Sequence, residues 1–354
     1  MTWRAARLGE EQDDLRAMLD TLAADRESEI SDDDPAEVAR LRQQLAELGV
    51  WTMGVREEHG GGGADVATLG VAWERLGRHW PSLGWASAQA HAALDLIGGE
   101  EDAEGVELCA GLHAGTATIA VVDAAAAHVD LEQRDRRLIG TVDRVDTTAA
   151  DPALLVLDGS DRALLIPVSG TTTTAIRRTG LAGAQTRTVI VDVAIDDVLQ
   201  IDAAPVASAR CRLMHGAAAV AAGIAGRATD DAADYAGTRV QFGGPLTAIP
   251  TVRGSLFDQA AGASVLDTLA VAATDDVVTA TGAARHACAQ AIEVATAALQ
   301  SHGGYGYLTE YPVEHHLRDA ISLRAATNVD GAATRAAGVL VGRPSNPTLV
   351  KEAS

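Results

Sequence analysis

The chain has few of the residues that mark a secreted, metal-binding or membrane protein. Only three of its 354 residues are cysteines, and Cys109, Cys211 and Cys288 lie far apart without a CxxC pair. Isolated thiols argue against a disulfide framework or a zinc site and predict a cytoplasmic location. No apolar run approaches the roughly 18 residues that span a bilayer, and the charged N-terminus does not resemble a secretory signal.

Positive charge is also scarce. The chain has one lysine, Lys351, among 28 basic residues, against 49 acidic residues, and its net charge is −21. Phosphates and acidic lipids would be repelled by such a chain, so neither nucleic acid nor a membrane is expected as a partner. The 47% hydrophobic content is that of a globular protein with a substantial core.

The histidines are scattered along the chain. None of His59, His128, His302, His315 and His316 belongs to a cluster with the spacing of metal ligands. We therefore expect exposed polar residues and no metal site.

The N-terminal residues 1–115 are predicted to be helical. Asp34 followed by Pro35 is typical of a helix start, with Asp34 as N-cap and Pro35 in the first turn. A second helix is expected to start at Asp65. The four glycines at 60–63 predict a turn rather than a phosphate-binding loop, because no Lys-Ser/Thr pair follows them.

The pattern changes to short strands in residues 116–204 and returns to long Ala-rich helices in residues 205–354. The strand segments are brief apolar or alternating runs separated by Asp, Gly, Thr and Pro, which is typical of a small sandwich or barrel. The predicted fold class is therefore α+β with three domains: helical, β and helical.

Residues 300–320 read QSHGGYGYLTEYPVEHHLRDA. Gly303 and Gly304 let the backbone approach a ligand closely, and successive amides in such a turn can form an anion-binding nest. Taken alone, the glycine pair favours a helix stop followed by a turn.

Three further segments give this run a context. They read LGVWTMGVREEHGG at 48–61, YAGTRVQFGGP at 235–245, and GL through VIVDVAIDDV at 180–198. In combination with residues 300–320 they resemble the acyl-CoA dehydrogenase family along nearly the whole chain. The resemblance implies an N-terminal helical domain, a middle β domain and a C-terminal four-helix bundle, usually assembled as a tetramer.

The resemblance also implies chemistry. In this family a glutamate removes a proton next to an acyl-CoA thioester, FAD accepts a hydride, and the electrons usually pass to an electron-transferring flavoprotein. Each FAD lies across a subunit interface. Arg239 matches the arginine that pairs with the FAD pyrophosphate, and Gln241 and Phe242 match positions of the same pocket. Gln300 and the Gly303–Gly304 pair match the loop on the adenosine side.

Two segments depart from the family at the flavin ring. The loop that normally offers hydroxyls and glycine amides to the ring is VDAAAAHVD at 122–130, without Ser, Thr, Gly or Pro. The strand that normally stacks an aromatic residue on the flavin corresponds to DRVDTTA near 143–149. We therefore do not expect this chain to hold a flavin ring by itself.

The family's catalytic glutamate is also absent. Counting along the motifs puts Thr327 at its usual position and Leu213 at the position used by other members, and neither side chain is an acid. A three-residue slip would instead bring Asp330 to the site, with a side chain one methylene shorter than that of glutamate.

These features predict a non-catalytic subunit of an α2β2 acyl-CoA dehydrogenase. A paralogous partner would supply the base and the flavin loop, while this chain would complete the FAD site. Such assemblies resemble those acting on CoA-activated steroid side chains in actinobacteria. Two alternatives stay open: a self-sufficient homotetramer with Asp330 as base, and a flavin-free acyl-CoA-binding or scaffold protein.

Overall fold

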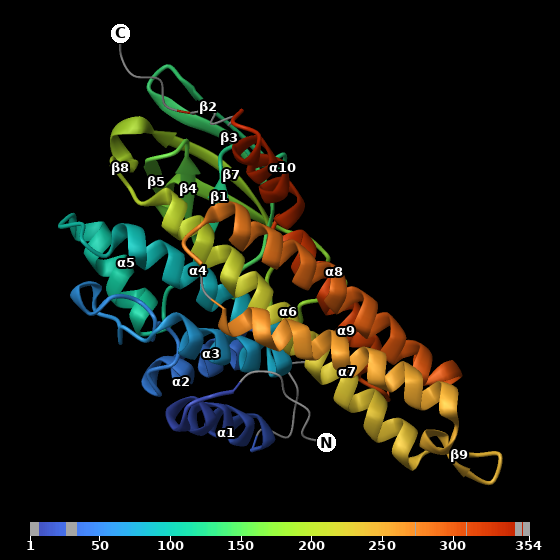
Figure 1. Cartoon of the computed structure of the whole chain (residues 1–354). Coiled ribbons are helices and arrows are strands. Elements are labelled where there is room, and N and C mark those ends of the chain that lie inside the picture. Colours follow the sequence, from blue (N-terminus) through green and yellow to red (C-terminus); the bar gives the residue numbers. More distant parts are fainter. Residues whose placement is uncertain (1–6, 26–33, 273, 309, 344–348, 350–354) are drawn as a thin grey trace.

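The computed structural model describes residues 7–25, 34–272, 274–308, 310–343 and 349. The described chain runs from helices through strands back to helices (Figure 1), so the predicted fold class is confirmed. The first helices are α1 (Glu10–Ala24), α2 (Pro35–Glu47), α3 (Val66–His79), α4 (Pro81–Ile97) and α5 (Ala103–His113).

Both predicted helix starts are confirmed. The Asp34 carboxylate accepts a hydrogen bond from the Ala36 amide at 2.9 Å, with Pro35 in the first turn of α2. The Asp65 carboxylate accepts one from the Thr68 amide at 2.7 Å at the start of α3. In each case a short acidic side chain satisfies an amide that the helix leaves without a partner.

The β part consists of two four-stranded sheets with the orders β1-β4-β5-β8 and β2-β3-β7-β6. Their strands are β1 (Ile119–Asp123), β2 (Val129–Arg134), β3 (Arg137–Val145), β4 (Ala153–Asp158), β5 (Arg162–Ile166), β6 (Thr171–Ala175), β7 (Arg187–Ala194) and β8 (Leu199–Ile201). In the first sheet, β1 pairs in parallel with β4, starting with Ile119 opposite Ala153. The two sheets share one apolar core, to which Val156 contributes from the first sheet and Val191 from the second. The predicted sandwich is therefore present.

The C-terminal helices surround one long helix. This helix, α6 (Val206–Thr238), packs against α3, α4, α7 and α8. The others are α7 (Pro250–Val271), α8 (Val277–Ser301), α9 (Val313–Ala326) and α10 (Val329–Leu340). Alanines fill much of the buried face of α6, and Gly223 lets α3 approach closely, since a Cβ there would lie 2.1 Å from the Glu74 carbonyl oxygen.

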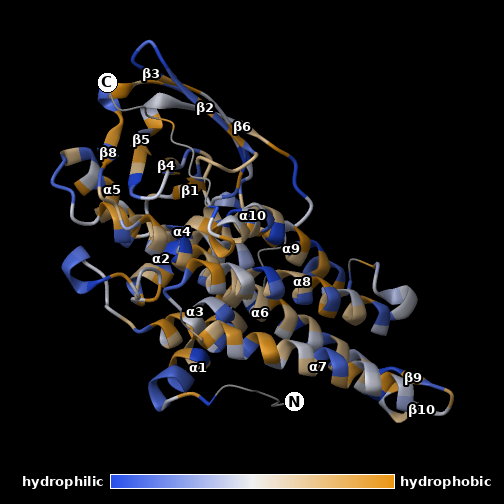
Figure 2. Ribbon diagram, turned by 45° about the horizontal axis from the view of Figure 1, so that its top comes forward, coloured by the Kyte–Doolittle hydropathy of each residue, from blue (hydrophilic) through white to orange (hydrophobic). Residues whose placement is uncertain are grey.

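A short hairpin follows α6 and lies at the end of the helical part farthest from the sheets (Figures 1 and 2). It pairs β9 (Val240–Gln241) with β10 (Gly244–Pro245) in antiparallel fashion. Its two turn residues, Phe242 and Gly243, have φ of +53° and +86°, as a type I′ turn requires. Among the described helices, none is long and apolar enough to cross a membrane.

Candidate functional site

A cavity of about 100 Å³ lies where the β part meets the C-terminal helices. Leu213 of α6 and Thr327, the two residues at the family's usual glutamate positions, both line it. The segments 122–130 and 143–149, predicted to replace the flavin loop and strand, also line it. The structure thus brings four separately identified parts of the sequence to one place.

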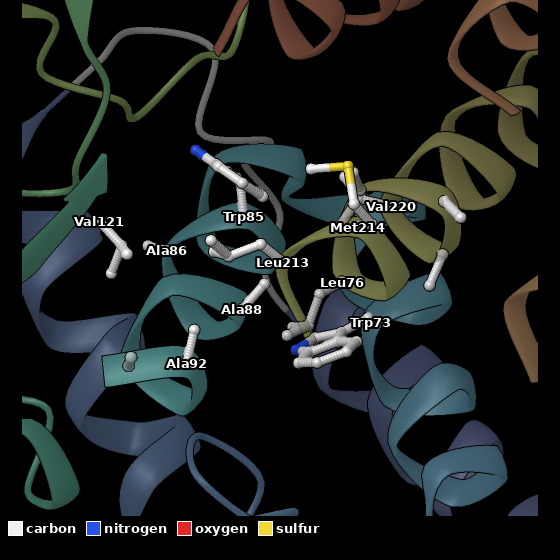
Figure 3. Close-up of a cluster of buried hydrophobic side chains, with 14 of the residues drawn as sticks. Trp73, Leu76, Trp85, Ala86, Ala88, Ala92, Val121, Leu213, Met214 and Val220 are labelled. Atoms are coloured by element: carbon white, nitrogen blue, oxygen red, sulfur yellow. The ribbon is translucent and has the colours of Figure 1, made fainter. Parts of the chain in front are cut away.

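One wall of the cavity is apolar. Trp85 of α4 and Leu213 and Met214 of α6 lie beside one another there, with Val121 of β1 nearby (Figure 3). The exposed fractions of Trp85, Leu213 and Met214 are between 4% and 7%. This wall is continuous with the main hydrophobic core, which fixes its shape.

An ion cluster also lines the cavity. The Asp123 carboxylate at the end of β1 accepts a hydrogen bond from Arg210 Nε of α6 at 2.8 Å and lies 3.2 Å from Arg335 Nη2 of α10. Arg210 also donates to the Gly159 carbonyl oxygen at 2.9 Å. Asp123 therefore ties two C-terminal helices to the β part.

Residues 122–130 were described only by their lack of Ser, Thr, Gly and Pro, and the sequence did not predict this ion cluster. The signal was present in part, because Asp123 is a charged residue within this segment. The pairing with Arg210 and Arg335 joins residues 87 or more positions apart. Local sequence patterns do not reveal such a contact.

Thr327 and Asp146 also line the cavity. The Thr327 hydroxyl donates to the Arg324 carbonyl oxygen at 3.3 Å and contacts the Cys288 thiol, whose pKa burial raises to about 12. Burial raises the pKa of Asp146, while a hydrogen bond from the Thr186 hydroxyl opposes that rise. Asp146 is the one carboxyl at this cavity, among the described residues, that makes no ion pair within 4 Å.

Asp330 lies outside this cavity, in a neighbouring surface hollow of about 330 Å³. Its carboxylate accepts hydrogen bonds from Arg324 Nε at 3.0 Å and Arg285 Nε at 3.3 Å. The bond from Arg324 lowers the Asp330 pKa, and burial only partly offsets it. An ion-paired carboxylate with a lowered pKa is a weak base, so the geometry does not favour Asp330 as a proton acceptor.

A second hollow, of about 430 Å³, lies near the end of α6. Arg239, Gln241, Gln300 and Gly303 all line it, so four of the six predicted cofactor-binding residues are brought together. The Arg239 guanidinium lies 4.7 Å from the Tyr305 ring centroid. No carboxylate of a described residue pairs with this guanidinium, which is therefore available to an anion.

The remaining two predicted residues lie differently. Phe242 is 94% exposed at the tip of the β9–β10 hairpin and does not line the hollow within this chain. Gly304 faces open space. Gly303 has φ of +57° two residues after the end of α8, so it also serves as the predicted helix stop.

The two sites lie at opposite ends of α6. Leu213 and Arg239 are separated by 26 positions, and a rise of 1.5 Å per residue puts them about 39 Å apart. FAD, even fully extended, is much shorter than this distance. No single molecule of it can contact both sites of one chain.

The residues present fit one part of FAD and not the other. The hollow around Arg239 has an available guanidinium and the polar side chains of Gln241, Ser255 and Gln300, a donor set suited to a diphosphate. The cavity beside Trp85 holds about 100 Å³, below the range of about 300–1,000 Å³ for pockets of drug-sized ligands. Its ion cluster offers no flat apolar face for a flavin ring.

The described residues contain no group of three or more His, Cys, Asp or Glu side chains that would hold a metal ion.

Comparisons with known proteins agree with the fold. The family model for the acyl-CoA dehydrogenase N-terminal domain matches residues 9–102, and that for the C-terminal domain matches residues 206–331. An acyl-CoA dehydrogenase of Bacillus subtilis is 41% identical over 112 residues, which cover 30% of each chain. That match therefore spans less than a third of the relative's length.

Two longer matches cover most of the chain. The probable acyl-CoA dehydrogenase YngJ of Bacillus subtilis is 27% identical over 315 residues, or 78% of this chain and 83% of that protein. The structure of a Mycobacterium smegmatis glutaryl-CoA dehydrogenase in complex with FADH2 superposes with a TM-score of 0.79, covering 96% of both chains at 17% identity. At that identity the superposition supports the fold alone.

Proposed function

Because this chain belongs to the acyl-CoA dehydrogenase family of FAD-dependent dehydrogenases, we propose that it is the non-catalytic subunit of a heteromeric member. In this proposal Arg239, Gln241, Gln300 and Gly303 bind the pyrophosphate and adenosine part of an FAD. The flavin ring and the catalytic glutamate belong to a paralogous chain. The complex dehydrogenates an acyl-CoA between its α and β carbons.

The distance between the two sites carries this proposal. The hollow around Arg239 has groups that suit a diphosphate, yet it lies about 39 Å along α6 from the cavity beside Trp85. An FAD at Arg239 must therefore hold its ring against another chain.

The residues that line the cavity support the proposal that this subunit is not catalytic. Neither Thr327 nor Leu213 can accept a proton, and the Asp123 carboxylate is already ion-paired with Arg210 and Arg335. The chain's own residues at this cavity thus hold the β part against the C-terminal helices. The two carboxyl groups that line the cavity, those of Asp123 and Asp146, do not stand at the family's glutamate positions, which correspond to Leu213 and Thr327.

Exposed apolar residues near the hairpin support a partner there. Phe242 is 94% exposed, Phe257 of α7 is 71% exposed and Val240 is 62% exposed. A bulky residue with positive φ, such as Phe242, is strained, and such strain is often retained for function. We propose an α2β2 complex with half the usual number of flavins, which acts in the cytoplasm and passes electrons to an electron-transferring flavoprotein.

The substrate in this proposal is an acyl-CoA that reacts in the partner's pocket. A fused-ring acyl group, as in steroid side-chain esters, far exceeds the cavity of about 100 Å³ in this chain. Such a group would be accommodated by the partner chain.

Co-expression with a paralogous dehydrogenase chain, followed by flavin absorbance and subunit counting, tests the proposal. We expect a colourless chain alone, and a yellow complex with two FAD per four subunits that oxidises an acyl-CoA. A chain that alone binds stoichiometric FAD and turns over would instead establish the homotetramer with Asp330. A complex without flavin under any condition would establish the scaffold alternative.

Arg239→Ala in the complex tests the diphosphate site directly. We expect FAD to dissociate at least about tenfold more readily, because an arginine–phosphate contact is a charge-assisted bond. Arg136→Ala is the matched control, since Arg136 is an exposed arginine that pairs with Asp196 on the β part. Equal FAD retention in both variants would contradict the role given to Arg239.

A further inference from the structure

We propose that Tyr305 positions the Arg239 guanidinium for a diphosphate without neutralising its charge. Tyr305 is thus a positioning residue, which acts through Arg239 rather than by its own contact with the cofactor. The inference rests on the proposed function, because it assumes that Arg239 binds the FAD diphosphate. It adds the residue that orders this arginine before the diphosphate arrives.

The backbone of Arg239 is held on both sides. Its amide donates to the Tyr235 carbonyl oxygen at 2.9 Å, and its carbonyl oxygen accepts from the Leu246 amide at 2.9 Å. The side chain is less constrained. Within the described part of the chain, the guanidinium makes no ion pair, and its one hydrogen bond is with Tyr305. A long side chain without an anchor samples many rotamers, and ordering them opposes the binding of a ligand.

Tyr305 provides an anchor for this side chain. Arg239 Cζ lies over the Tyr305 ring, 4.7 Å from the ring centroid, a distance at which a cation is attracted to an aromatic face. Arg239 Nη2 also lies 3.5 Å from Tyr305 Oη, which is long for a hydrogen bond. Both residues line the hollow of about 430 Å³ near the end of α6, so the contact occurs at the candidate site itself.

The chemistry of this contact suits an arginine that binds an anion. A carboxylate in the same place would neutralise the guanidinium and occupy its N–H donors, as Asp123 does for Arg210. A tyrosine ring is uncharged, and here its hydroxyl engages only one nitrogen of the guanidinium. The remaining donors and the positive charge therefore stay available to phosphate oxygens.

The Tyr305 ring is itself held by packing. It meets the Tyr311 ring edge to face, with the centroids 5.9 Å apart and the planes at 70°. Tyr311 packs in the same way against Tyr235 of α6 at 5.6 Å and against His302 at 5.8 Å. His302 is only 4% exposed. A series of ring contacts therefore connects the Arg239 guanidinium to the buried part of the C-terminal helices.

The test measures how fast FAD leaves the co-expressed complex, from the flavin absorbance that remains after timed gel filtration. We expect Tyr305→Leu to release FAD about three- to tenfold faster than the wild type, as the loss of one cation–π contact implies. Tyr305→Phe keeps the ring and should stay within about twofold of the wild type. In the Arg239→Ala background, Tyr305→Leu should cause no further loss, because Tyr305 acts only through the arginine.

Tyr307→Leu is the matched control. Tyr307 lies two residues further along the chain, is 76% exposed and does not line the hollow. This variant should release FAD at the wild-type rate.

The outcomes separate this inference from the proposed function. Equal release by Tyr305→Leu and Tyr307→Leu, with faster release by Arg239→Ala, would overturn the role of Tyr305 and leave the proposed function intact. Equal losses in Tyr305→Phe and Tyr305→Leu would overturn the role of the ring. A further loss when Tyr305→Leu is added to Arg239→Ala would show a direct contact with FAD and contradict positioning. Wild-type release by Arg239→Ala, or a complex without FAD, would overturn both the inference and the proposed function.

Discussion

Arg210 Nε donates to the Asp123 carboxylate across 2.8 Å and so joins the central helix α6 to the last residue of β1. The same carboxylate contacts Arg335 of α10 at 3.2 Å. Asp123 is 8% exposed, so its ion pairs are shielded from water and from salt. One acidic residue therefore holds three elements together beside the cavity.

Asp123→Asn is expected to destabilise the fold. Removing one partner leaves two largely buried arginines without a compensating charge, which costs about 2–3 kcal/mol when the arginines retain some access to water. In urea unfolding we expect a lower midpoint concentration of urea, while the dependence of the free energy of unfolding on urea concentration stays the same.

Asp192→Asn is the control for this variant. Asp192 pairs with Arg137 at 2.6 Å, but the side chains are 66% and 48% exposed, and such a pair contributes less than about 1 kcal/mol. Equal midpoints for the two variants would show that the Asp123 cluster does not stabilise the fold.

The parts of the molecule that the sequence predicted are those fixed by local chemistry. Asp34 and Asp65 start helices because a short acid caps the next amides, and this needs only neighbouring residues. Motif counting also located Leu213 and Thr327, which line one cavity although they are 114 positions apart. The spacing of the family's motifs carried that information.

The ion cluster was not predictable in the same way. Asp123, Arg210 and Arg335 meet only because a strand end and two helices pack together, and no local pattern encodes that packing. Phe242 remains a predicted site residue. It follows Arg239 in the motif, but it is 94% exposed and does not line the hollow within this chain.

His91 is expected to make stability depend on pH. Its Nε2 accepts from the Gly54 amide at 3.0 Å and its Nδ1 donates to the Ser87 carbonyl oxygen at 2.8 Å, which only a neutral ring can do. Burial lowers its pKa from 6.5 to about 3. Between these values the unfolded chain binds a proton that the folded chain excludes. The free energy of unfolding should therefore fall by about 1.4 kcal/mol per pH unit below 6.5.

Urea unfolding of the wild type and His91→Gln at several pH values between 7 and 4 measures this dependence. At pH 7 His91 is neutral in both the folded and the unfolded chain. The variant should be less stable there because it lacks the two hydrogen bonds that the neutral ring makes. The difference between the two proteins should shrink steadily as the pH falls below 6.5. Two stability curves that run parallel through this range would contradict the assigned protonation of His91.

The crossing of α3 and α6 is expected to tolerate no side chain at Gly223. A Cβ there would lie 2.1 Å from the Glu74 carbonyl oxygen and 2.5 Å from the Arg78 amide nitrogen. Because both atoms belong to the backbone, the helices would have to separate. We expect Gly223→Ala to destabilise by about 2–3 kcal/mol.

Gly237→Ala, on the same helix, is the matched control. A Cβ at Gly237 meets nothing within 4 Å, so the substitution should raise stability by up to about 1 kcal/mol through helix propensity. Denaturant midpoints of the two variants should move in opposite directions. A loss of stability in both would show that the effect at Gly223 does not come from the helix crossing.

Phe242→Asn is expected to separate folding from assembly. Asparagine followed by glycine is preferred in a type I′ turn, so the hairpin should keep or gain stability while the exposed ring is removed. If the ring is buried against a partner, its loss should weaken the complex at least about tenfold. Analytical ultracentrifugation of the co-expressed complex measures the change. Val106→Ser, which removes a 52% exposed side chain from α5, should leave assembly unchanged. An intact complex with Phe242→Asn would mean that the strained turn residue serves no partner.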